Sequence, residues 1–131
     1  MTRRASKVFL AVAFLCACGD SSGPSEPQPG ILTVQLTTNA TTDRAALIQL
    51  SGPGPISSVQ SDNAGVMVFS TETGTAVKTI VTGTLTSGAL LQFNVEDVNK
   101  VKAYNATIVE LANNTNALQT NLSGRSLRIT K

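Results

Sequence analysis

Histidine and tryptophan are absent from this chain of 131 residues, and it has only two cysteines and one tyrosine. Without an imidazole the chain has no proton shuttle near neutral pH and no zinc or iron site that uses histidine. The commonest catalytic devices are therefore excluded. The length allows one domain. The sequence is consequently more informative about location and architecture than about a specific reaction.

The N-terminal segment is typical of a secretion signal. Arg3, Arg4 and Lys7 precede an uncharged, mostly apolar stretch at residues 8–17, and small residues follow. This stretch is too short to cross about 30 Å of hydrocarbon as a helix, which takes about 20 residues. We interpret residues 1–17 as a signal peptide rather than a transmembrane helix.

Leu15, Cys16, Ala17 and Cys18 resemble the lipobox of bacterial lipoproteins, with an aliphatic residue three positions before the cut, a small residue just before it and a cysteine just after it. The resemblance implies that the Cys18 thiol carries a diacylglycerol and that Cys16 leaves with the signal. Gly19 is not the aspartate that retains enterobacterial lipoproteins in the inner membrane. The expected location is the cell envelope, lipid-anchored, and the outer membrane if the organism has one.

Two alternatives compete with lipidation at Cys18. Cleavage before Cys16 would place the bulky Leu15 next to the cut, where the lipobox requires a small residue. A disulfide between Cys16 and Cys18 in a plain secreted protein would close a tiny, strained loop that adds little constraint to the unfolded chain. Lipidation at Cys18 remains the favoured hypothesis.

Cleavage changes the charge of the chain. The precursor carries ten basic and eight acidic residues, and loss of residues 1–17 removes three basic residues and no acid, which leaves a net charge of about −1. No run of Lys or Arg survives that could follow a phosphate backbone. Nucleic acid is therefore not an expected partner.

Residues 18–30 are expected to form the lipidated cysteine and a tether. This segment contains Pro24, Pro27 and Pro29 and, after Cys18, no aliphatic side chain, so it cannot build a core. Its composition predicts a flexible to semi-extended spacer that spans up to about 35 Å at about 3 Å per residue.

From residue 31 onwards, short runs rich in Val, Ile, Leu and Thr alternate in polarity and are separated by turn sequences such as SDNAG and TSG. This pattern is typical of β-strands with one apolar face. Nine strands are predicted, at residues 32–37, 46–50, 56–61, 66–71, 76–82, 89–95, 103–112, 117–122 and 126–130. Residues 31–131 are therefore expected to form an all-β domain, an antiparallel β-sandwich with jelly-roll or immunoglobulin-like topology. The alternative at residues 97–102 is a helical turn.

The segment VTGTLTSGALLQFNV, residues 81–95, resembles the central block of cohesin-like modules, in which a strand bounded by glycines precedes an alternating strand that ends in an aromatic residue and a valine. The residues that carry the resemblance are Gly83, Leu85, Gly88, Leu90, Phe93 and Val95. It implies a jelly-roll-like sandwich of nine strands, from a superfamily that also holds carbohydrate-binding modules. It also suggests a protein partner.

No catalytic set is recognisable, since GxSxG and phosphate-loop motifs are absent. The conceivable carboxylate pairs are Glu96 with Asp97 and Glu72 with Glu110. Adjacent strand residues face opposite ways, so Glu96 and Asp97 should diverge. A calcium loop that starts at Asp97 lacks its later ligands. We expect no enzyme activity, no cofactor and no metal.

After loss of the signal the aromatic residues are Phe69, Phe93 and Tyr104. Alternation places Phe93 in the core, whereas Phe69 and Tyr104 are the possible ligand contacts. So few aromatic rings cannot build a linear platform for a sugar chain. The hypothesis from sequence is therefore a non-catalytic module that binds a protein partner or serves a structural role, by a sheet face or by the SGPGPISS and SDNAG segments. The alternative is a glycan-binding lipoprotein.

Overall fold

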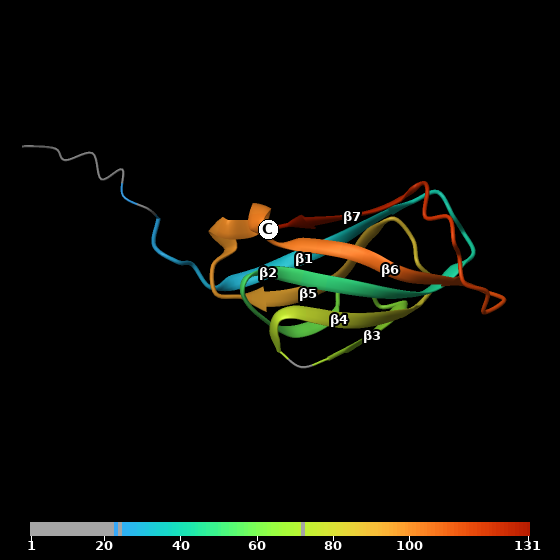
Figure 1. Ribbon diagram of the computed structural model, residues 1–131, viewed down its shortest axis with the longest axis horizontal. Coiled ribbons are helices and arrows are strands. Elements are labelled where there is room, and N and C mark those ends of the chain that lie inside the picture. Colours follow the sequence, from blue (N-terminus) through green and yellow to red (C-terminus); the bar gives the residue numbers. More distant parts are fainter. Residues whose placement is uncertain (1–22, 24, 72) are drawn as a thin grey trace, which may run out of the picture.

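The computed structural model describes residues 23, 25–71 and 73–131, and the chain enters the domain at one end, beside a short helix (Figure 1). The predicted signal peptide, Cys18 and Glu72 lie outside the described residues. The domain is all-β and antiparallel, as predicted. Its elements are β1 (Gly30–Thr38), β2 (Asp43–Ser61), β3 (Val66–Ser70), β4 (Gly74–Gly83), β5 (Gly88–Val95), the 3-10 helix η1 (Val98–Ala103), β6 (Asn105–Asn113) and β7 (Arg125–Thr130).

Strand β2 connects two groups of strands. Its N-terminal half pairs with β4 and β6, and β4 also pairs with β3. Its C-terminal half pairs with β5, which pairs with β1, and β1 pairs with β7. The ladders therefore run in the order β3-β4-β2-β5-β1-β7, with β6 also on β2.

The described residues contain seven strands rather than the nine predicted, and one reason is that two predicted strands are halves of β2. The Pro and Gly residues of SGPGP, which suggested a turn, lie inside the strand. Regular pairing with β4 lapses between Ser51 and Ile56. Proline has no backbone N–H to donate, so it is tolerated where a strand leaves its ladder.

The predicted strand at residues 117–122 is also not formed. There, Leu118 makes a single bridge with Ala112. The Asn113 side-chain oxygen accepts hydrogen bonds from the N–H groups of Thr115 and Ala117, both at 3.0 Å. A side chain that satisfies backbone donors locally competes with the ladder, and this explains the irregular loop.

The helical turn considered at residues 97–102 is confirmed as η1. Asp97 is its N-cap, because its carboxylate accepts the Asn99 N–H at 3.0 Å. Strand β6 therefore starts only at Asn105. No helix in the described ranges is long and apolar enough to cross a membrane.

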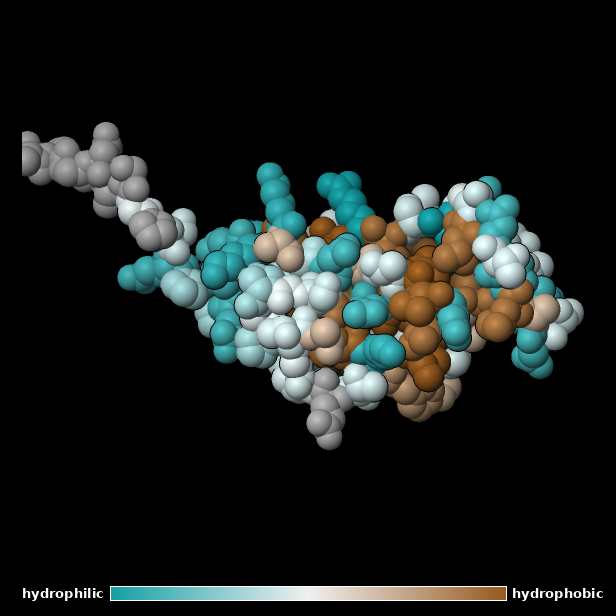
Figure 2. Space-filling view, in the orientation of Figure 1, coloured by the Kyte–Doolittle hydropathy of each residue, from teal (hydrophilic) through white to brown (hydrophobic). Residues whose placement is uncertain are grey.

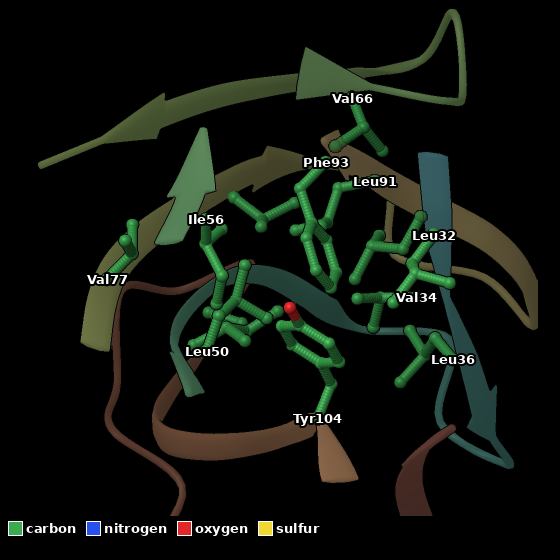
Figure 3. Close-up of a cluster of buried hydrophobic side chains, with 14 of the residues drawn as sticks. Leu32, Val34, Leu36, Leu50, Ile56, Val66, Val77, Leu91, Phe93 and Tyr104 are labelled. Carbon is green, nitrogen blue, oxygen red and sulfur yellow. The ribbon is translucent and has the colours of Figure 1, made fainter. Parts of the chain in front are cut away.

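The core lies between the two groups of strands and draws on both (Figure 3). Phe93 is fully buried, as alternation predicted, and its ring centroid is 6.1 Å from that of Tyr104. The β2 side chains Ile48 and Leu50 and the β1 side chains Leu32 and Val34 are also fully buried. Inward-facing apolar side chains from both groups of strands therefore form this core.

One buried ion pair joins distant parts of the chain. The Arg125 guanidinium donates to both carboxylate oxygens of Asp43, at 2.6 and 2.9 Å. Asp43 is 2 % exposed. This bidentate contact fixes the start of β7 to the start of β2.

Candidate interaction surface

The most distinctive surface feature is an apolar patch on the outward side of β3, β4, the N-terminal half of β2 and β6. Figure 2 shows hydrophobic residues gathered in a band across this face. We define the patch by Leu47, Met67, Phe69, Ile80 and Leu118. All but Leu47 have between 48 % and 65 % of their surface exposed, and Leu47 is half-buried.

Strand register explains why the patch is continuous. Leu47 on β2 pairs with Ile80 on β4, and Ile80 pairs with Phe69 on β3. Directly paired side chains lie on the same face about 5 Å apart, so these three form one apolar row. Met67 lies in the adjacent row, and Leu118 lies beside the bridge to Ala112 at the other edge.

The patch is shallow and has polar margins. One hollow beside the row is lined by Leu47, Phe69, Ser70, Thr71, Lys78 and Ile80. A second is lined by three alanines together with Leu47, Ile80, Glu110, Leu111 and Leu118. An apolar surface with a polar rim is typical of a site that binds a macromolecule.

The structure separates the two aromatic residues suggested as ligand contacts. Phe69 is 55 % exposed and belongs to the patch. Tyr104 is 6 % exposed, and its ring packs over the backbone of Gly52 and against Phe93 (Figure 3). Burial, followed by the charges of Glu96 and Asp97, raises the pKa of Tyr104. This ring belongs to the core and presents no face to a ligand.

Of the two conceivable carboxylate pairs, the described residues include Glu96 with Asp97, whereas Glu72, the partner suggested for Glu110, lies outside them. Glu96 and Asp97 line one small hollow together with Tyr104, although alternation predicted that they would diverge. They converge because the strand ends at Val95 and Asp97 turns to cap η1. Hydrogen bonds occupy the Asp97 carboxylate, and Glu110 lies exposed on β6 in another part of the fold.

The end of the predicted tether is bound to η1 rather than free. The Gln28 N–H donates to Asp97 Oδ1 at 3.2 Å, and the Val98 N–H donates to the Gln28 carbonyl at 2.8 Å. The side-chain amide of Asn99 donates to the Glu26 carbonyl at 3.5 Å. The Gln28 hydrogen bond is the main reason why the pKa of Asp97 is lowered. We call residues 26–28 the strap.

The two segments suggested as recognition loops differ in the structure. SGPGPISS lies within β2, where Ile56 is fully buried, so it is not a loop tip. SDNAG forms the exposed turn between β2 and β3, and Asn63 stabilises it by accepting the Gly65 N–H at 2.9 Å. Only this second segment projects as a loop.

The sequence contained a signal for the patch that the prediction did not use. In ALIQL, residues 46–50, the buried face of the strand is formed by Ala46, Ile48 and Leu50. Leu47 lies on the opposite face, where a polar residue would be expected. Ile80 likewise lies between buried Thr79 and Val81. An apolar residue on the polar face of a strand indicates an outward apolar surface.

Neither a metal centre nor a relative identifies the site. No group of three or more His, Cys, Asp or Glu residues that could hold a metal ion occurs in the part of the chain that the structure describes. No family model matches the sequence, and no curated protein or solved structure gives a significant match.

Proposed function

We propose that this protein is a lipid-anchored, non-catalytic lipoprotein of the cell envelope whose β-domain binds a protein partner or serves a structural role through the apolar patch. The exposed row Leu47, Ile80 and Phe69 carries the proposal. Large exposed apolar side chains that are contiguous across three strands are uncommon on a monomer that binds nothing.

The pairing of β2 with two groups of strands supports a β-sandwich. Buried side chains from β1 and β5 meet those from the N-terminal half of β2 and from β4 in one core. Two antiparallel groups that share one apolar interior are what sandwich packing requires. Jelly-roll topology and a cohesin-like origin remain predictions from the sequence.

The position of the chain entry agrees with an N-terminal anchor. The strap holds residues 26–28 beside η1, at the end of the domain where the N-terminal segment leaves (Figure 1). The patch lies on the side of the domain, so it stays accessible when this end faces a membrane.

The interaction proposal is tested by proximity labelling with the full-length chain on intact cells. We expect Phe69→Ser with Ile80→Ser to remove labelled partners, because both side chains lie at the centre of the patch. Ile31→Ser is the matched control, since Ile31 is 49 % exposed but lies on β1. Equal labelling by all three proteins would refute a role for the patch.

The anchor is tested by metabolic labelling with palmitate. We expect Cys18→Ser to abolish labelling and Cys16→Ser to retain it, because Cys18 occupies the lipobox position of the acylated cysteine. Labelling that persists without Cys18 would contradict the lipobox assignment.

Glycan binding is the second candidate, and the exposed ring of Phe69 favours it. A polysaccharide pull-down would support it if wild-type protein is retained and Phe69→Ala is not, while Ile31→Ala behaves as wild type. Retention that is independent of Phe69 would exclude stacking on this ring.

A further inference from the structure

We propose that the apolar patch binds a second copy of the same chain, face to face about a two-fold axis. This rests on the proposed function of the patch and names its partner. The argument uses the charges beside the patch, the placement of its large and small side chains, and its size.

Two residues of opposite charge, Lys78 and Glu110, lie on either side of the apolar row formed by Leu47, Ile80 and Phe69. Lys78 on β4 pairs with Gln49, and Glu110 on β6 pairs with Leu47, so both lie on the patch face on either side of β2. Both are exposed, and within the described residues neither forms a salt bridge. A two-fold axis that passes between them sets each Lys78 against Glu110 of the other copy, and it forms this pair twice.

The same axis brings complementary side chains together. Strands lie about 4.8 Å apart, and side chains on one face repeat about every 6.8 Å. On a sheet face with these spacings, the two-fold rotation that sets Lys78 opposite Glu110 of the second copy also sets Phe69 opposite Ala45 of the second copy. It also leaves Leu47 and Ile80 close to the axis. A large ring thus meets a small side chain, and the remaining apolar row packs on itself.

A self-complementary partner uses both charges equally. An apolar partner with a single type of charge would leave either Lys78 or Glu110 unpaired and desolvated, which weakens binding. The second copy supplies one acid and one base at the required positions. We therefore favour it over an unrelated partner.

The face suits association on a membrane rather than in dilute solution. Four strands about 4.8 Å apart and up to ten residues long give a face of about 19 Å by 34 Å, which is below the roughly 800 Å² per partner of a typical stable interface. Strand β3 has only five residues, which reduces it further. Anchoring to one membrane raises the effective concentration of the copies and offsets this weakness.

The test is chemical cross-linking of the full-length chain in membranes. Gln49 is exposed on β2 near the proposed axis, so Gln49→Cys should be linked to its counterpart by a short bis-maleimide. Asn94→Cys, exposed on β5, is the matched control. Both are compared with the chain that carries no added cysteine. Equal yields at positions 49 and 94 would overturn the proposal.

Charge exchange in the Gln49→Cys background provides the decisive readout. Lys78→Glu or Glu110→Lys alone should lower the cross-linked fraction by about fivefold, because each places like charges together twice. The two changes together should restore it, since the pairs re-form with reversed sign. Failure of the double variant to recover would refute the two-fold arrangement.

Failure of this proposal can be distinguished from failure of the proposed function. If cross-links at position 49 are absent but Phe69→Ser with Ile80→Ser still removes labelled proteins, another protein occupies the patch. The dimer is then refuted, and the proposed function stands. If cross-links at position 49 are absent and proximity labelling is unchanged by Phe69→Ser with Ile80→Ser, both the dimer and the proposed function of the patch are refuted.

Discussion

Thr79 is the one residue in the described structure with a buried side-chain polar atom that lacks a hydrogen-bond partner. It is fully buried on β4, between core residues, and its Oγ1 receives no hydrogen bond. A buried hydroxyl without a partner keeps its desolvation cost, whereas a methyl group of the same size would not.

We predict that Thr79→Val raises the free energy of unfolding by about 1 kcal/mol, because it replaces this hydroxyl by an isosteric methyl. Chemical denaturation at constant m-value measures the change. Thr82→Val, at a partly exposed position on the same strand, should change stability little. A lower midpoint for Thr79→Val would show that Oγ1 has a partner in solution.

Gly52 is required for the packing of the only tyrosine. A Cβ at this position would overlap three atoms of the Tyr104 ring. We predict that Gly52→Ala lowers the free energy of unfolding by about 1 to 3 kcal/mol, the range for an overpacked core. Thermal unfolding followed by circular dichroism measures it.

Gly54→Ala is the matched control, two residues along the same strand. Its Cβ would lie 3.5 Å from Tyr104 Oη, an ordinary contact. If the free energy of unfolding falls by the same amount in both variants, glycine is required by the backbone conformation of β2 and not by the tyrosine ring.

At the scale of elements, the alternating strands β1, β4, β5 and β7 were predictable because each has one apolar face that fills the core. The continuation of β2 through SGPGP was not predictable, since Gly52, Pro53 and Pro55 have the composition of a turn. Only the ladders on both sides show that the strand continues. The alternation of polar and apolar residues predicts which face of a strand points inward. It does not predict whether another element covers the outward face. The patch was missed for this reason.

We expect the attachment of the strap to η1 to depend on pH. The pKa of Asp97 is lowered in the fold, chiefly by the Gln28 N–H. The stability that this carboxylate contributes is therefore present above its unfolded pKa of about 3.9 and is lost as the pH falls through the lower folded value. Acid should release the strap from η1.

We predict that the amide NMR signals of Gln28 and Asn99 titrate together, with a midpoint below about pH 3.9. Both N–H groups donate to Asp97 Oδ1, so protonation of one carboxyl group affects both. Asp97→Asn should abolish the shared titration. A midpoint at or above the ordinary aspartate value would mean that the strap does not hold the carboxylate in its charged form.

At the scale of the whole molecule, the entry of the chain and the patch occupy different parts of one domain. The N-terminal segment leaves beside η1, whereas the patch lies along the side formed by β3, β4, β2 and β6 (Figures 1 and 2). With the anchor proposed above, this arrangement lets the patch of one copy meet another copy on the same membrane.

The passage of β2 between the two groups of strands has a mechanical consequence. A partner that pulls on the patch loads Leu47 on the N-terminal half of β2, and the same backbone continues to the half that is hydrogen-bonded to β5. Tension then passes through the β5–β1 ladder to Gly30, where the chain leaves towards the N terminus. The backbone of β2 thus joins the two groups of strands covalently, and the rest of the path to Gly30 consists of the backbone hydrogen bonds of the β2–β5 and β5–β1 ladders.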